Sequence, residues 1–141
     1  MGCWLVKEEP TKYSFACFLA DGRTEWTGVR NYQARNHLRA MRLGDEVVFY
    51  HSGKLKAALG TAVVAGEAFA DPTAEDGDWS CVVLEAAAAF AEPVPLSSVR
   101  KDPAFAECVL VKNSRLSVMP LTAAEYRRFC QLGRARKRAK A

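Results

Sequence analysis

The sequence lacks the common signatures of catalysis, of nucleotide binding and of membrane insertion. It contains no GxxxxGK[ST], GxGxxG, GxSxG or HExxH motif, and only His37 and His51 could serve as imidazole bases or ligands. No apolar run approaches the roughly 20 residues that cross a bilayer, and charged residues from Lys7 onward interrupt the opening apolar run before it could form a signal peptide core. We therefore expect no metal, no cofactor and no membrane association.

Paired cysteines are also missing. The five cysteines are scattered along the chain, and no two are spaced as a CxxC metal or redox pair. An odd, unclustered set is typical of free thiols in a reducing cytosol. Cys3 and Cys81 lie in apolar runs, where we expect them to pack as small hydrophobic side chains.

Positive charge is absent from one part of the chain and concentrated in two others. The formal net charge is +4, but five basic residues fall within residues 133–141, and without them fifteen basic residues face sixteen acidic ones. No lysine or arginine occurs from Ala57 to Val99, whereas four arginines and no acid lie between Trp26 and Gly44. One surface of the body could therefore attract a polyanion while another repels it.

The 141 residues, half of them hydrophobic, are enough for one domain with a sizeable core. We predict a domain over residues 1–132 and a basic, disordered tail over 133–141. Apolar and β-branched runs predict strands near residues 3–6, 46–51, 58–65, 80–88, 110–111 and 116–119.

Helix signals occur between these strands. Ser14 predicts the cap of a short helix that ends at Asp21-Gly22, and Asn31 that of a second helix running to residue 41. Residues 96–107 predict helical turns broken by a proline, and Thr122 with Glu125 predicts a capping box. The pattern favours an α+β fold, a compact mixed β-barrel flanked by short helices.

The most informative stretch runs from Glu25 to Asn36, with two aromatic residues, two arginines, two asparagines and a glutamine at a turn and a helix start. Such a set suits nucleic acid, because rings stack on bases, amides read base edges and guanidinium groups bind phosphate. The alternative is a helix entry whose tryptophan anchors the core and whose arginines face solvent. Composition alone leaves both interpretations open.

The sequence resembles the EVE domain family, the family of thymocyte nuclear protein 1, within the PUA-like superfamily. The resemblance runs from Trp4 to about Leu132, and Glu8 departs from the serine that is usual in the family's lysine loop. It rests on these motifs: Trp4-Leu-Val-Lys-Glu-Glu-Pro10, Trp26-Thr-Gly-Val-Arg-Asn-Tyr-Gln-Ala-Arg-Asn36, Gly44-Asp45, Phe49-Tyr-His-Ser52, Ala70-Asp-Pro-Thr73 and Arg115-Leu-Ser-Val-Met-Pro120.

The resemblance implies a PUA-like pseudobarrel with a surface pocket for a modified base, in particular a flipped 5-substituted cytosine such as 5-methylcytosine in DNA. It implies that Trp26 stacks on the base, that Asn31, His51 and Ser52 read its edges, and that Ser117 closes the side. Lys7, Arg30 and Arg35 would hold phosphate or the pocket walls, and Glu9 and Val29 belong to the same ligand-binding set. Tyr32, Tyr50 and Trp4 are expected in the core or the pocket floor.

The nucleic-acid backbone is expected to contact a separate basic set: Arg35, Arg39, Arg134, Arg136, Lys137 and Arg138. Three other functions stay open: an RNA-binding PUA-like module, a nucleotide-processing enzyme that uses His51 near a cysteine, and a structural domain whose own side chains fill the Trp26 region. We expect a monomer in a bacterial cytoplasm, since the chain starts directly at its first strand, or a nuclear protein if the source is eukaryotic.

Overall fold

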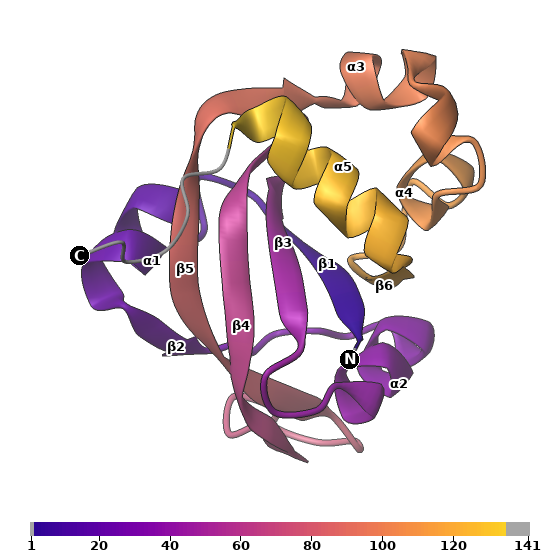
Figure 1. Ribbon diagram of the computed structural model, residues 1–141. Helices are drawn as coiled ribbons and strands as arrows, with labels where there is room; N and C mark the ends of the chain where they lie inside the picture. Colours follow the sequence, from indigo (N-terminus) through magenta and orange to yellow (C-terminus); the bar gives the residue numbers. More distant parts are fainter. Residues whose placement is uncertain (1, 135–141) are drawn as a thin grey trace.

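The computed structural model describes residues 2–134, and one mixed sheet forms their framework (Figure 1). The hydrogen-bonded strand order is β2-β5-β4-β3-β1-β6. Among the strands of residues 2–134, only β1 and β3 pair in parallel, and the other neighbours are antiparallel. The strands are β1 (Cys3–Glu8), β2 (Arg23–Glu25), β3 (Glu46–His51), β4 (Ala57–Ala70), β5 (Ser80–Pro95) and β6 (Val118–Leu121).

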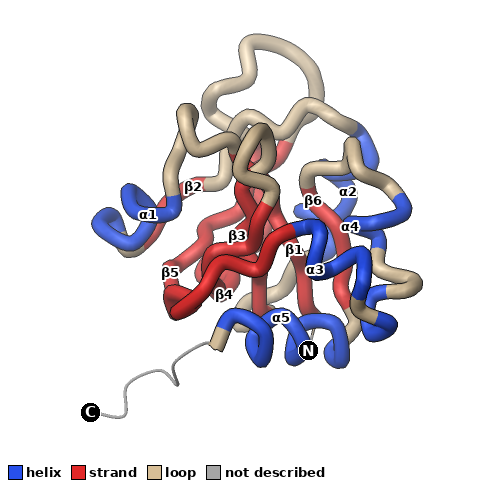
Figure 2. The backbone as a smooth tube through the Cα atoms, turned by 90° about the horizontal axis from the view of Figure 1, so that it is seen from above, coloured by secondary structure: helices blue, strands red, loops and turns tan. Residues whose placement is uncertain are grey.

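Short helices cover the sheet and its ends. The longest, α5, lies across one face of the sheet in Figure 1, and Figure 2 shows it along one side of the molecule. The helices are α1 (Phe15–Asp21), α2 (Tyr32–Ala40), α3 (Leu96–Lys101), α4 (Val109–Lys112) and α5 (Ala123–Gly133), with one 3-10 turn at Pro103–Phe105. The expected α+β pseudobarrel flanked by short helices is confirmed.

The two long strands bend around the core. The β4–β5 ladder shifts register at four places, and such irregularities let strands curve. Gly60 lies at one of these places, where a side-chain carbon would overlap the ring of Phe15 and the carbonyl oxygen of Ala88. The missing side chain therefore lets α1 pack closely on the sheet.

Aromatic rings fill the core beside α1. Phe18 and Phe49 stack with centroids 5.6 Å apart, and Trp26 meets Phe49 edge-on at the same distance. On the face covered by α5, Phe129 packs against Phe105 at 4.7 Å. All five side chains are almost fully buried. These contacts join α1 to the sheet and α5 to the 3-10 turn.

Local signals set the helix starts where the sequence predicts them. The Ser14 hydroxyl accepts from the Cys17 N–H, and the Asn31 side chain accepts from the Ala34 N–H. Thr122 and Glu125 form the reciprocal capping box of α5. A side chain that bonds the first free N–H groups needs only nearby residues, so these boundaries are readable from sequence.

Some predicted strands differ from the structure. Residues 110–111 belong to α4, and the strand expected at 116–119 lies at Val118–Leu121 with Pro120 inside it. Pro120 is tolerated because β6 is an edge strand. Both β4 and β5 are longer than predicted, and β2 was not predicted. Within residues 2–134, no helix has the length and apolar character needed to cross a membrane.

Candidate nucleic-acid interface

The parallel pairing of β1 with β3 creates the site, because parallel strands end at the same edge of a sheet. In this register Lys7 lies opposite Tyr50 and Glu8 opposite His51. The Ser52 N–H donates to the Glu8 carbonyl at 3.2 Å, and the Lys7 N–H donates to the Ser117 carbonyl at 2.9 Å. The ends of both strands and the segment before β6 therefore meet at one place.

A cavity of about 480 Å³ opens at this edge. Figure 2 shows β1 and β3 ending among loops on the side of the molecule away from α5. The predicted site residues that line the cavity are Lys7, Glu9, Trp26, Val29, Arg30, Asn31, Ser52 and Ser117. The structure thus brings most of the predicted site residues together around one cavity.

A buried carboxylate shapes the loop between β2 and α2 that forms one wall. Asp71 Oδ2 accepts from the Gly28 N–H at 2.8 Å and from Arg30 Nη1 at 3.0 Å, and Asp71 Oδ1 accepts from the N–H and hydroxyl of Thr73. Gly28 has a φ of 83°, a conformation that favours glycine. Burial alone would raise the pKa of Asp71, but the hydrogen bonds outweigh it and lower the pKa to about 2.

The apolar part of the cavity comes from two side chains that belong mainly to the core. Trp26 is 4% exposed and Val29 is 7% exposed. The backbone N–H of Trp26 donates to the Val82 carbonyl at 2.7 Å, which ties the cavity wall to β5. Both residues line the cavity. Trp26 is therefore both a buried residue of the core and a part of the cavity wall.

Polar lining residues surround that apolar surface, and each has interactions within the protein. Asn31 uses its side-chain oxygen to cap α2, so its amide nitrogen is the part left to donate. Lys7 Nζ donates to the Ser114 carbonyl at 2.8 Å and lies 5.6 Å from the centre of the Tyr50 ring. Burial lowers the pKa of Lys7. The exposed Glu9 carboxylate makes only a long ion pair with Lys12, at 3.8 Å.

His51 does not line the cavity. It is 2% exposed, and both ring nitrogens are bonded within the protein. Nδ1 lies 2.7 Å from the Glu8 carbonyl, and Nε2 accepts from the Phe15 N–H at 3.1 Å. Because Phe15 supplies a donor to Nε2, the proton sits on Nδ1. His51 thus joins α1 to the β1 end, and neither nitrogen is free for the enzymatic alternative.

The buried thiols offer that alternative no nucleophile either. Burial raises the pKa of Cys81 and of Cys108 to about 11, so both are neutral thiols near neutral pH. Cys3 and Cys81 pack in β1 and β5, as the sequence predicts. Among the described residues, no three His, Cys, Asp or Glu side chains gather as metal ligands.

Arg35, which was predicted in the ligand-binding set, does not line the cavity, and neither does Arg39; both are paired with Asp78. Arg35 Nη1 donates to the Asp78 carbonyl at 3.1 Å, and Arg39 Nη2 contacts the Asp78 carboxylate at 2.6 Å. The Arg35 guanidinium also lies 5.0 Å from the Tyr32 ring, which stacks on Trp79 at 4.9 Å. Tyr32 is 65% exposed, so its predicted place in the core or pocket floor is wrong.

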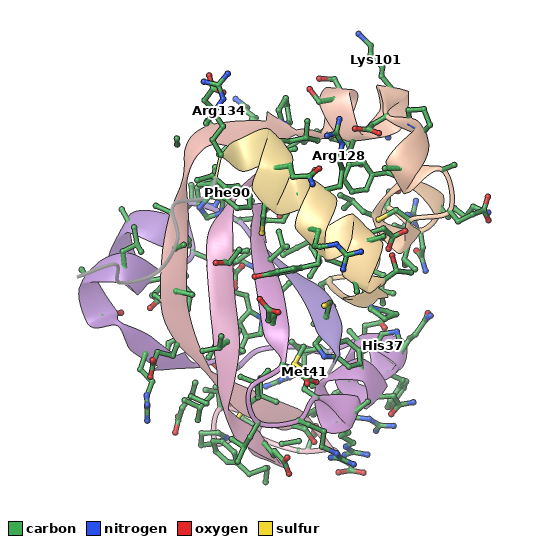
Figure 3. The ribbon with its side chains drawn as sticks, viewed as in Figure 1. His37, Met41, Phe90, Lys101, Arg128 and Arg134 are labelled. Atoms are coloured by element: carbon green, nitrogen blue, oxygen red, sulfur yellow. The ribbon has the colours of Figure 1, made fainter. Side chains whose placement is uncertain are left out.

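The predictions for Trp4 and Tyr50 and for the basic tail have different outcomes. Trp4 and Tyr50 are buried as predicted. Arg134 ends α5 beside Glu92, and Figure 3 shows it on the opposite side of the molecule from His37 in α2. The other tail positions expected to contact the backbone, Arg136, Lys137 and Arg138, lie outside the described residues.

Sequence reasoning missed several lining residues, namely Glu8, Lys12, Thr27, Gly28, Ser114 and Arg115. Four of them stand inside motifs that carry the family resemblance, so the motif boundaries were the available signal. Lys12 and Ser114 have no such signal, because they reach the cavity from loops whose course depends on the fold.

Comparison with known proteins agrees with this architecture. The chain matches the EVE domain model over residues 2–132. Human thymocyte nuclear protein 1 is 32% identical over an alignment that covers 87% of this chain and 70% of the human protein. An Agrobacterium tumefaciens protein of known structure is 42% identical, with a TM-score of 0.91 and coverage of 94% of this chain and 93% of that one.

The human relative has also been solved with a ligand. The crystal structure of human thymocyte nuclear protein 1 in complex with 5-methylcytosine-containing DNA is 31% identical, with a TM-score of 0.86. The match covers 97% of this chain and 100% of the human one. The family model and these relatives span nearly all of the described residues. The chain belongs to the EVE domain family.

Proposed function

We propose that the protein binds DNA and reads a modified base, a flipped 5-methylcytosine, in the cavity at the ends of β1 and β3. The observation that carries this proposal is the lining of that cavity, which combines an apolar surface with donors and an acceptor at one edge. The human relative whose structure contains 5-methylcytosine DNA supports the choice of ligand.

The cavity is large enough to hold an extruded base. At about 480 Å³ it falls within the range of small-molecule sites, roughly 300 to 1,000 Å³. A base inside an intact duplex cannot reach such a concave site, so the nucleotide must leave the stack, at a cost of a few kcal/mol. Stacking on an aromatic side chain, about 1 to 3 kcal/mol per base, offsets part of that cost.

The lining matches the edge and the methyl group of the proposed base. Cytosine presents an amino donor beside acceptor atoms, so the Glu9 carboxylate can accept while the Asn31 amide nitrogen donates. Val29 and the exposed part of Trp26 form the apolar surface for the methyl group. A buried methyl contributes about 0.8 kcal/mol, so contact with it favours the methylated base about fourfold.

The proposed role of Asn31 can be tested without removing its structural role. Asn31→Asp keeps a good N-cap for α2 but replaces the amide donor with a second oxygen. We expect this variant to fold like the wild type and to bind a 5-methylcytosine duplex at least tenfold more weakly. Fluorescence anisotropy with labelled duplexes, methylated and unmethylated, and with a methylated RNA strand measures the effect.

The apolar surface needs milder changes, because Trp26→Ala would open a core cavity at a cost of about 3 to 5 kcal/mol. Trp26→Phe keeps a ring in the core and shrinks the face offered to the base, and Val29→Ala withdraws the contact with the methyl group. We expect Val29→Ala to reduce the preference for methylated over plain DNA. Equal affinity of the wild type for both duplexes would refute the proposed function, and a preference for the RNA strand would reassign it.

A further inference from the structure

A second cavity, of about 290 Å³, lies beside the first. The two share Lys7, Ser52 and Ser114, so these three residues form the wall between them. Its far side is formed by Lys56, in the turn before β4, and by Arg100 of α3. A ligand that fills the first cavity therefore comes within a side chain's width of the second.

The second cavity is cationic. Three of its lining residues, Lys7, Lys56 and Arg100, carry positive charge, and the lining contains no carboxylate. Among the ion pairs of residues 2–134, none involves these three cations. Arg35 and Arg39 differ, since both are paired with Asp78. The positive charge of the second cavity is therefore available to an anion.

The fold fixes the backbone that carries Lys56 and Arg100. Lys56 has a φ of 47°, an uncommon conformation for a residue with a side chain. Its carbonyl accepts from the Leu96 N–H at 2.8 Å, which ties the turn to the first residue of α3. Arg100 is one turn further along the same short helix. The buried ring of Tyr50 lines the space between them and Lys7.

We propose that the second cavity binds a backbone phosphate of the nucleotide next to the base that occupies the first cavity. This inference rests on the proposed function, because the position of the phosphate follows from a base bound in the first cavity. The lining of the second cavity, three cations without a carboxylate, suits an anionic phosphate group rather than an uncharged second base. Lysine and arginine are the usual ligands of phosphate in nucleic-acid complexes.

The same chemistry could serve a free phosphate or a mononucleotide, so the experiment separates the two sources. A duplex with one 5-methylcytosine is prepared as a series in which a single phosphate near that base is replaced by an uncharged methylphosphonate. Affinity is measured for the wild type and for Lys56→Gln/Arg100→Gln. The matched control is Lys54→Gln/Lys101→Gln, which removes two neighbouring charges outside the cavity, and Figure 3 shows Lys101 pointing away from the sheet.

We expect one methylphosphonate position to weaken wild-type binding at least fivefold and to have no further effect in Lys56→Gln/Arg100→Gln. The salt dependence of that variant should flatten by about 0.9 in the log-log slope, the value of one phosphate contact on duplex DNA. The control variant should keep the response of the wild type to the methylphosphonate series. A response that survives loss of Lys56 and Arg100, or no responsive position, overturns the inference.

A titration with inorganic phosphate, followed by the amide signals of Tyr50 and Ser52, completes the test. Shifts that saturate in the wild type and disappear in Lys56→Gln/Arg100→Gln support an anion site even if methylated and plain DNA bind alike, a result that would refute only the base-reading function. Saturation by phosphate without any coupling to the methylphosphonate series assigns the site to a free anion and overturns the backbone assignment. No shift and no coupling overturn the site itself.

Discussion

Replacing Asp71 by asparagine removes the charge that organises the loop between β2 and α2. The Asp71 side chain is fully buried, and its two oxygens accept four hydrogen bonds from Gly28, Arg30 and Thr73. An amide has one oxygen, so in Asp71→Asn one set of donors faces an NH₂ group instead of an acceptor. The Arg30 guanidinium also loses its ion-pair partner.

Asp71→Asn should lower the unfolding free energy, and the pKa of Asp71 sets the part of this decrease that depends on pH. The shift from the ordinary 3.8 to about 2 corresponds to about 2 kcal/mol at 1.36 kcal/mol per unit. Because the folded pKa lies below the unfolded one, this stabilisation is complete above about pH 4 and is lost as the pH falls toward 2. The Arg30 side chain is partly exposed and stays hydrated, so the main cost is that of buried donors that lose their acceptor, and we expect a total loss of unfolding free energy of about 2 to 3 kcal/mol near pH 7.

Urea denaturation of the wild type and of Asp71→Asn, at several pH values between 7 and 3, measures both quantities. The difference in unfolding free energy should be largest at pH 6 to 7 and should narrow below pH 4. Asp78→Asn is the control, because the Asp78 side chain is 79% exposed and its ion pairs should contribute less than about 1 kcal/mol. A difference that stays constant between pH 7 and 3 would refute the assignment of a stabilising charge to Asp71.

Three further predictions concern α5 and the residues after it. Thr122→Ala, which removes the capping box, should lower the unfolding free energy by about 1 kcal/mol in urea denaturation, whereas Thr11→Ala in an exposed turn should change it little. Gly133→Ala should destabilise by about 1 to 3 kcal/mol, because the added methyl overlaps the Phe90 ring, and an unchanged melting temperature would contradict that packing. Deletion of residues 134–141 should weaken binding to plain and methylated DNA alike and make the affinity less dependent on salt concentration. Lost discrimination between the two DNAs would show that the tail has another role.

Local chemistry explains which parts of the fold were predictable. The caps at Ser14, Asn31 and Thr122 involve residues three positions apart, so the sequence alone predicts where α1, α2 and α5 begin. The strand β2 has three residues and owes its existence to pairing with β5, about 60 positions away in the chain. The short apolar run at residues 109–112 fits a strand or a helix equally well by periodicity, and it is helical.

The candidate site likewise has parts that the sequence predicts and parts that depend on contacts between distant residues. The motifs around Lys7, Trp26 and Ser117 predict residues that share one cavity, although they lie far apart in the chain. The burial of His51 was not predictable, because it depends on the Phe15 N–H and the Glu8 carbonyl meeting its two nitrogens. In the same way, Lys56 and Arg100 share a cavity only because the Leu96 N–H joins α3 to the turn.

The central claim is that a modified base leaves the duplex and enters the cavity at the ends of β1 and β3. The most direct measurement is the fluorescence of 2-aminopurine placed next to 5-methylcytosine in a duplex, because its emission rises when the neighbouring base unstacks. The account predicts a saturable rise with the wild type, a smaller one with Asn31→Asp at the same bound fraction, and a rise that needs about fourfold more protein when cytosine replaces 5-methylcytosine. Binding confirmed by anisotropy, with no change in emission, would contradict it.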